Sequence, residues 1–210
     1  MRLEDMPDIG LTRELLDRIH GIALLTELDI YHLFRFAREI PEGGTYLELG
    51  VYNGGAVVCA AEASRATERN ITLIAVDMGF GSGFYDNTGG FPVRAMEGKI
   101  DDRGIVSAID DTSVDLIFND ADQRYDALCR DIAVYWDKLK PGAVLLGHDY
   151  LTAPDFGFMD TKRVVDDVFG KLATVMEGHT TMWMVRKDEE TDAAVKELRE
   201  KIKGEDERAE

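Results

Sequence analysis

A glycine-rich segment that joins an expected strand to an expected helix is the first candidate for a ligand site. It runs from Glu48 to Gly55 and reads ELGVYNGG. Such a turn lets the backbone approach a ligand closely and directs helix N–H groups towards it. The spacing is G-x-x-x-G-G, whereas dinucleotide-binding folds use G-x-G-x-x-G. The acid Glu48 suits a ligand with hydroxyl groups and a positive charge better than a pyrophosphate. A plain tight turn is the alternative interpretation.

A second acid, Asp77, follows the apolar run of residues 71–76 (ITLIAV). It comes 27 positions after Gly50, close to where an acid binds ribose hydroxyls in nucleotide-binding α/β folds. Gly50 and Asp77 together indicate a nucleoside site more specifically than either does alone. The alternative role for Asp77 is to cap its own loop.

Two later strand ends carry further polar residues that could do chemistry. Asp120 and Asp122 follow the run 114–118 (VDLIF), and His148 and Asp149 follow the run 143–146 (AVLL). His148 is the best acid–base candidate, because an unperturbed histidine has a pKa near 6.5. Its alternative role is a structural hydrogen bond at the strand end. Asp120, Asp122 and Asp149 form a candidate Mg²⁺ site, because Mg²⁺ prefers carboxylate and water oxygens.

The elements that position these residues alternate between strands and helices, so the sequence predicts a Rossmann-like, doubly wound α/β sheet. Ligands in such sheets bind beyond the carboxyl ends of the strands. The last two strands are joined too closely for a helical crossover, so this pair should be antiparallel. The expected strands are 45–49, 71–76, 114–118, 143–146, 172–176 and 181–185, and the expected helices are 54–65, 124–139 and 161–169.

Three regions are expected along the 210 residues. Residues 1–44 should form N-terminal helices that pack on the core, residues 45–187 the ligand-binding domain, and residues 188–210 a charged, solvated tail. The loop 79–90 is interpreted as a lid with Phe84 and Tyr85 as apolar contacts, or else as a disordered surface loop. Residues 154–159 are a candidate for the opposite wall, and Trp183 is expected in the core.

The charge balance limits the partners that this protein can have. There are 24 Lys and Arg against 41 Asp and Glu, a net charge of −17. Such a surface repels phosphate backbones and anionic membranes, so we expect neither a nucleic-acid nor a membrane partner. The chain has no apolar run near the roughly 20 residues of a membrane span and no signal pattern, so a cytoplasmic location is expected. Cys59 and Cys129 are expected to be buried, reduced thiols, and the apolar N-terminal helices could mediate a homodimer.

Three segments carry a resemblance to a known family. Residues 45–55 (TYLELGVYNGG), 75–77 and 114–150 resemble the class I S-adenosylmethionine-dependent methyltransferases. The chain is most similar to the small-molecule family called methyltransferase type 24, over roughly residues 27–187. The resemblance implies a seven-stranded sheet, mostly parallel, with an antiparallel C-terminal strand. It implies S-adenosylmethionine as cofactor, with Asp77 on its ribose, Asp101 at its adenine and Asp120 over its sulfonium. The other residues implied to bind it are Glu48, Gly50, Tyr52, Asn53, Gly54 and Met78.

One position departs from the family pattern. The family usually has Asp-x-x-His where this chain has Asp120 to Gln123, and glutamine cannot serve as a general base. The resemblance implies O-methylation of a small hydroxylated metabolite. Because Gln123 cannot act as a base, we expect His148 or a metal ion to activate the acceptor, with Asp120 beside it. Two alternatives remain open: a non-catalytic protein that binds S-adenosylmethionine or S-adenosylhomocysteine, and a nicotinamide-dependent oxidoreductase.

Overall fold

A seven-stranded sheet forms the centre of the protein, in the order β3-β2-β1-β4-β5-β7-β6. The computed structural model describes residues 3–150, 160–176, 178 and 180–209. Neighbouring strands from β3 to β5 are parallel, and β7 lies between β5 and β6, antiparallel to both. The predicted fold class is therefore confirmed. The strands are β1 Thr45–Leu49, β2 Thr72–Asp77, β3 Val93–Glu97, β4 Val114–Asn119, β5 Leu139–Gly147, β6 Thr174–Val175 and β7 Trp183–Arg186.

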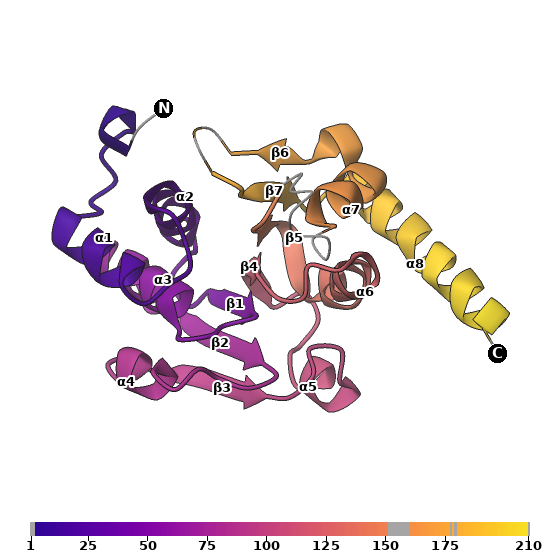
Figure 1. Ribbon diagram of the computed structural model, residues 1–210, viewed down its shortest axis with the longest axis horizontal. Helices are drawn as coiled ribbons and strands as arrows, with labels where there is room; N and C mark the ends of the chain where they lie inside the picture. The colour runs from indigo at the N-terminus through magenta and orange to yellow at the C-terminus, as the bar shows by residue number, and fades with distance from the viewer. Residues whose placement is uncertain (1–2, 151–159, 177, 179, 210) are drawn as a thin grey trace.

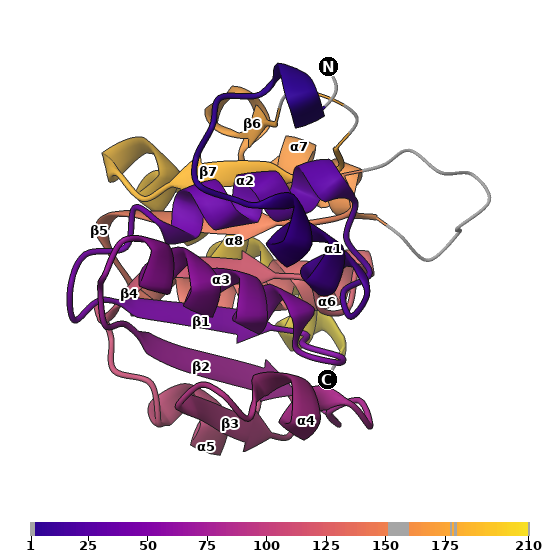
Figure 2. The same cartoon turned by 90° about the vertical axis from the view of Figure 1, so that its left-hand side faces the viewer.

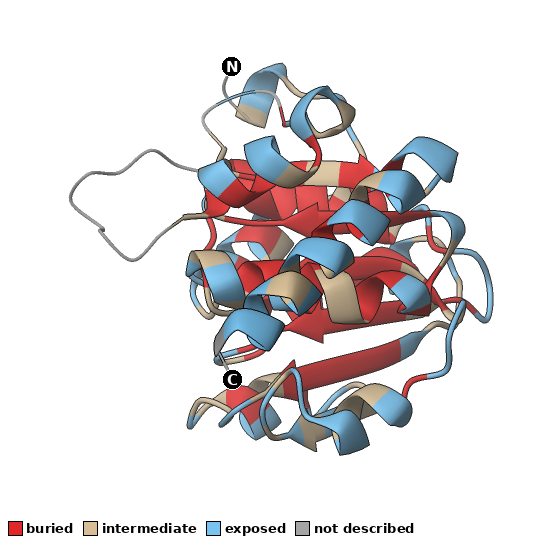
Figure 3. Cartoon of the chain, turned by 90° about the vertical axis from the view of Figure 1, so that its right-hand side faces the viewer, coloured by how far each residue is buried: buried red, intermediate tan, exposed pale blue. Residues whose placement is uncertain are grey.

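Helices cover both faces of the sheet (Figures 1 and 2). One face packs against α1 (Arg13–His20), α2 (Glu27–Ala37) and α3 (Gly55–Ala66). The other packs against α6 (Tyr125–Tyr135), α7 (Thr161–Val168) and α8 (Glu189–Ala209). Successive strand residues enter opposite cores, with Tyr46 on the α3 side and Leu47 on the α6 side. Figure 3 shows the central strands buried, behind helices whose outer faces are exposed.

The boundaries of several elements differ from those expected, including β6 and β7, which are shorter than predicted. The helix predicted to run to Leu139 ends at Tyr135 and continues as a 3₁₀ turn, η2 (Trp136–Lys138). β5 already begins at Leu139, because Leu139 pairs with Val114 before the register shifts at a bulge. Pro141, which cannot donate to the sheet, falls in that irregular stretch. The third strand, whose end the family resemblance places at residues 99–102, ends at Glu97, and the turn that follows leads into α5 (Arg103–Ser107).

The segment expected as a lid is partly built into the core. It contains a short helix, α4 (Phe84–Thr88), and Phe84 is buried and stacked on Phe80 with 4.1 Å between ring centroids. Phe84 is therefore a packing residue, whereas Tyr85 is exposed. The predicted wall at residues 154–159 lies outside the described residues. Two short 3₁₀ turns, η1 (Leu3–Asp5) and η3 (Gly170–Leu172), complete the elements.

Several other expectations are met. Trp183 is fully buried, and Cys59 and Cys129 are buried free thiols. The charged tail is helical, as α8, and it buries Val195 and Leu198 against the rest of the protein. Within the described part of the chain, every helix is too short or too polar to cross a membrane.

Candidate active site

A cavity of about 1170 Å³ opens at the carboxyl ends of the parallel strands. The loops that follow β1, β2, β4 and β5 line it, together with residues 22–25 between α1 and α2. It lies where the strand order reverses between β1 and β4, which is the expected place for a ligand in this fold. Its volume slightly exceeds that of usual small-molecule sites.

The glycine turn after β1 brings only some of its predicted residues to this cavity. Gly50 and Tyr52 line it, whereas Asn53 and Gly54 do not. The Asn53 side chain accepts a hydrogen bond from the Gly83 N–H at 3.3 Å, and a Cβ on Gly54 would lie 2.7 Å from Thr88. Asn53 and Gly54 therefore face the α4 region, and their part in binding a cofactor stays a prediction.

Glu48 is the most deeply buried carboxyl group that lines the cavity. It is 1% exposed, and the Tyr46 hydroxyl donates a hydrogen bond to it at 2.8 Å. Burial raises the pKa of Glu48 well above its usual range, and the nearby carboxylates of Asp120 and Asp77 raise it further. A cationic ligand in the cavity would favour the ionised form, so this group is suited to bind positive charge.

Asp77 supports the glycine turn through three hydrogen bonds. One carboxylate oxygen accepts the N–H groups of Val51 at 2.6 Å and Tyr52 at 3.1 Å, and the other accepts the Gly79 N–H at 2.9 Å. This is the loop-capping role that the sequence left open. Asp77 also lines the cavity, so the predicted contact with a ribose stays a prediction. Exposed Met78 and Asp101 line the cavity as well.

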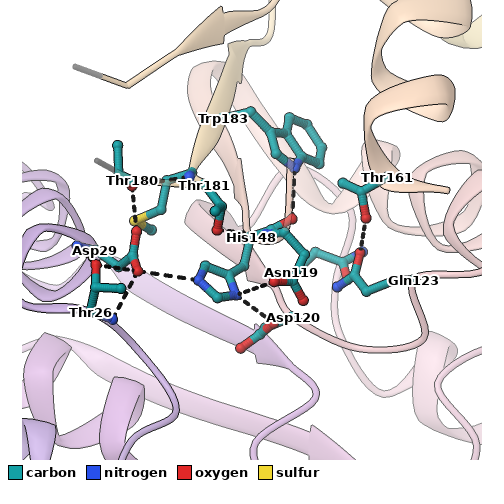
Figure 4. A network of polar contacts seen from close by, with 12 residues as sticks. Thr26, Asp29, Asn119, Asp120, Gln123, His148, Thr161, Thr180, Thr181 and Trp183 are labelled. Carbon is teal, nitrogen blue, oxygen red and sulfur yellow. Dashed lines mark hydrogen bonds and ion pairs between the residues drawn. The ribbon is translucent and has the colours of Figure 1, made fainter. Parts of the chain in front are cut away.

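His148 lies among three carboxylates at the end of β5. Its Nδ1 is 3.3 Å from an oxygen of Asp120 and 3.3 Å from one of Asp149, and its Nε2 is 3.4 Å from Asp29 (Figure 4). Burial lowers the pKa of His148, but its close contacts with the carboxylates of Asp120, Asp149 and Asp29 outweigh this effect and raise the pKa to about 12. The expected value near 6.5 is therefore wrong for the ligand-free protein. The imidazole is protonated at neutral pH and cannot act as a base there.

Asp120, His148 and Asp149 form a candidate metal site. One donor atom from each lies within 4.8 Å of the others, and the buried Nδ1 of His148 has no partner with hydrogen-bond geometry among the described residues. Asp149 has a left-handed backbone with φ of 59°, a conformation that Asp tolerates better than most residues. These donors fit a divalent cation. The predicted third carboxylate, Asp122, is instead bound by Arg124, with Nε 2.9 Å from its oxygens.

Gln123, which stands at the family's histidine position, does not line the cavity. It is buried, and its side-chain oxygen accepts a hydrogen bond from the Thr161 hydroxyl at 2.5 Å. The backbone carbonyl oxygen of Gln123 accepts a hydrogen bond from the Asp160 N–H at 2.8 Å. Gln123 therefore joins the β4–α6 loop to the start of α7.

Two acids of the site were not anticipated from the sequence. Asp131 on α6 lines the cavity, and burial raises its pKa to about 7. Asp29 on α2 contacts His148 from the other side of the ring. The only sequence signal for Asp29 is the pattern Thr26-x-x-Asp29 of a helix capping box, which the structure contains. Nothing in that pattern indicates the distant histidine.

Comparisons with known proteins agree with this geometry. A family model described as a methyltransferase domain, of type 24, matches residues 47–150. No curated protein matches this chain significantly in sequence.

Solved structures share the fold at low identity. MycE methyltransferase from the mycinamycin biosynthetic pathway, in complex with Mg, S-adenosylhomocysteine and mycinamycin VI, is 16% identical with a TM-score of 0.56. The match covers 88% of this chain but only 56% of MycE. An S-adenosylmethionine-dependent O-methyltransferase from Thermotoga maritima is 17% identical with a TM-score of 0.60. The match covers 82% of this chain and 71% of the Thermotoga maritima chain.

The methyltransferase PaMTH1 from Podospora anserina, bound to S-adenosylhomocysteine, is 15% identical with a TM-score of 0.61. That match covers 87% of this chain and 89% of PaMTH1. Residues 47–150 match a methyltransferase domain in sequence, and the seven-stranded sheet is shared with solved S-adenosylmethionine-dependent methyltransferases, so the chain carries a methyltransferase domain with the class I fold.

Proposed function

We propose that this protein binds S-adenosylmethionine in the large cavity and transfers its methyl group to a hydroxyl group of a small metabolite. The observation that carries the proposal is Glu48, a buried carboxyl group that opens into the cavity beside the glycine turn. Buried carboxyl groups are costly unless a partner compensates them. The adenosyl donor carries an ammonium and a sulfonium group, which are suitable partners.

We assign each cofactor-binding role from the strand that the residue follows, because each strand end faces a different part of the cavity. Glu48 and Asp120 place negative charge next to a cationic donor, and Gly50 and Tyr52 line the same part of the cavity. Asp77 retains acceptor capacity for a ribose hydroxyl, because the oxygen that accepts the Gly79 N–H has a second lone pair. Met78 directly follows β2 and Asp101 lies in the turn between β3 and α5, where we place the adenine.

Methyl transfer from a sulfonium is a direct displacement, so most of the rate enhancement should come from proximity and alignment. The apolar residues 22–25 would exclude water from the acceptor side of the cavity. The carboxylates around His148 favour its protonated form, so it is a poor base in the ligand-free protein, and a bound cation would have to displace the Nδ1 proton. A divalent ion held by Asp120, His148 and Asp149 would lower the pKa of an acceptor hydroxyl. Mg²⁺ is the expected ion, and the imidazole nitrogen would also suit Mn²⁺.

The charge of the cavity restricts the acceptor. Its lining contains nine carboxyl groups against Lys99, Arg124, Arg130 and His148. Anionic acceptors, including nucleic acids and phosphorylated metabolites, are therefore disfavoured. We propose a neutral or cationic hydroxylated molecule with an apolar part.

Isothermal titration tests the donor site. The wild-type protein should bind S-adenosylmethionine and not NADH, and Glu48→Gln should weaken S-adenosylmethionine binding by about tenfold to a hundredfold, because a buried charged contact is lost. Glu97→Gln is the matched control, since Glu97 ends β3 as an exposed residue outside the cavity. Preferred binding of NADH would replace the proposal with an oxidoreductase.

Turnover tests the second half of the proposal. A panel of hydroxylated acceptors with Mg²⁺ or Mn²⁺ should yield S-adenosylhomocysteine. Tight cofactor binding without turnover across neutral and cationic acceptors would favour the non-catalytic alternative. The homodimer and the cytoplasmic location remain predictions, and the former is measured by light scattering.

A further inference from the structure

Asp29 brings the N-terminal region of the chain into the candidate active site. It lies in the first turn of α2, is fully buried, and does not line the cavity. Its contact partner His148 is 119 residues away in the sequence, at the end of β5. Figure 4 shows His148 between Asp29 on one side and Asp120 on the other.

Three donors besides the histidine hold the Asp29 carboxylate. The Thr26 N–H donates at 2.9 Å and the Thr26 hydroxyl at 2.6 Å, both to the oxygen that faces His148. The Thr180 hydroxyl donates to the other oxygen. A capping box needs only the Thr26 contacts, so the approach to His148 exceeds what the helix end requires.

These contacts satisfy both oxygens of the buried Asp29 carboxylate. One of these oxygens faces the Nε2 side of the imidazole at 3.4 Å. The ring's other nitrogen, Nδ1, is buried, lacks a hydrogen-bond partner among the described residues, and lies 3.3 Å from both Asp120 and Asp149.

We propose that Asp29 is a positioning residue: it holds the Nε2–H side of His148 so that Nδ1 is presented as a ligand to a divalent cation between Asp120 and Asp149. Histidines that bind metals commonly donate their second N–H to a carboxylate, which fixes the tautomer and the ring orientation. The inference rests on the metal-dependent form of the proposed function. It adds a residue from α2, outside the matched methyltransferase domain.

The test measures Mn²⁺ binding to the full chain by the loss of the free-ion EPR signal. Asp29→Asn keeps an oxygen for the Thr26 N–H and removes the charge that faces His148. We expect Mn²⁺ affinity to fall about tenfold to a hundredfold, the usual effect of losing such a partner. S-adenosylhomocysteine affinity should change less than twofold, because Asp29 lies outside the cavity lining.

Asp188→Asn is the matched control. Asp188 also caps a helix start, accepting the Thr191 N–H at 2.9 Å at the beginning of α8, away from the cavity. This variant should bind Mn²⁺ like the wild type. Unchanged Mn²⁺ affinity in Asp29→Asn would overturn the inference, and so would a wild-type protein that binds S-adenosylhomocysteine but no Mn²⁺. A wild-type protein that binds no S-adenosylhomocysteine would instead overturn the proposed function.

A second measurement uses the wild type alone, in case Asp29→Asn does not fold. Pulsed EPR of the Mn²⁺-loaded protein should show coupling to an imidazole nitrogen, and His148→Gln should abolish this coupling. Mn²⁺ bound without nitrogen coupling in the wild type would mean that Nδ1 is not presented to the ion, which contradicts the proposal.

Discussion

The backbone of Gly50 lies directly against the backbone of Asp120. A Cβ on Gly50 would come within 2.4 Å of the Asp120 carbonyl oxygen and 2.6 Å of the Ala121 Cα. Gly50 also has φ of 80°, in the left-handed region that L-residues avoid. The glycine is therefore required by the neighbouring strand end before any ligand binds, and it fixes the distance between the loops after β1 and β4.

Gly50→Ala should be strongly destabilising. The left-handed backbone costs roughly 1–2 kcal/mol for alanine, and the clash with Asp120 adds to this cost. We expect the free energy of unfolding to fall by more than about 2 kcal/mol, measured by urea denaturation. Gly90→Ala is the control, because a Cβ there meets no atom within 4 Å, and it should change stability by less than about 0.5 kcal/mol. Equal stability of the two variants would refute this packing argument.

Asp131 should make stability depend on pH. Burial raises its folded pKa to about 7, whereas an unfolded Asp titrates near 3.9. Between these values the folded state binds more protons, so the free energy of unfolding falls as pH rises, by on the order of 1.4 kcal/mol per pH unit. Asp131→Asn should remove this loss, so its stability relative to wild type should increase from pH 5 to pH 7 and level off above pH 8.

Urea denaturation at each pH measures this difference, with Asp126→Asn as the control. Asp126 is an exposed carboxylate in the first turn of the same helix. Its variant should track the wild type at every pH. A stability difference for Asp131→Asn that does not vary between pH 5 and pH 8 would show that the group does not titrate in this range.

Gln123 should contribute to stability and not to cofactor binding. Gln123→Met leaves the buried hydroxyl of Thr161 without its acceptor, which costs about 1–3 kcal/mol. Adding Thr161→Val should recover most of this loss, because removing both partners of a buried hydrogen bond is nearly neutral. Denaturation and S-adenosylhomocysteine titration measure the two effects. Additive losses in the double variant would argue against a direct contact.

Leu24 should select the acceptor. Its side chain is 77% exposed at the cavity mouth, so Leu24→Ser should alter stability by less than about 0.5 kcal/mol. If the acceptor's apolar part covers Leu24, its KM should rise about tenfold while the affinity for S-adenosylhomocysteine stays the same. Val175→Ser, another exposed apolar position outside the cavity lining, should leave KM unchanged.

The sequence predicts the sheet and several residues that line the cavity, because both depend on local patterns. Apolar runs of strand length define β1, β2 and β4, and each is followed by an acid or a glycine at its carboxyl end. In a parallel sheet these ends meet at one edge, so Glu48, Asp77 and Asp120 could be brought together without coordinates.

The charge state of His148 could not be predicted in this way. It depends on Asp120 and Asp149, and also on Asp29, which is distant in the sequence and belongs to a helix that pattern analysis treats only as packing. The ion pair of Asp122 was not predicted for a different reason. Arg124, two residues later, binds it, and sequence alone does not decide between an ion pair and a metal site.

The packing of α2 also limits where the protein can be truncated at its N-terminal side. The family model begins at residue 47, and a fragment beginning there would lack α1 and α2. It would uncover the apolar side of α3 and the strand residues Phe118 and Leu146, which share a core with Leu33 and Phe34. It would also remove the anion that faces Nε2 of His148. The smallest unit that can be expressed on its own is therefore larger than the matched region, and truncation series should start upstream of Thr12, the residue that caps α1.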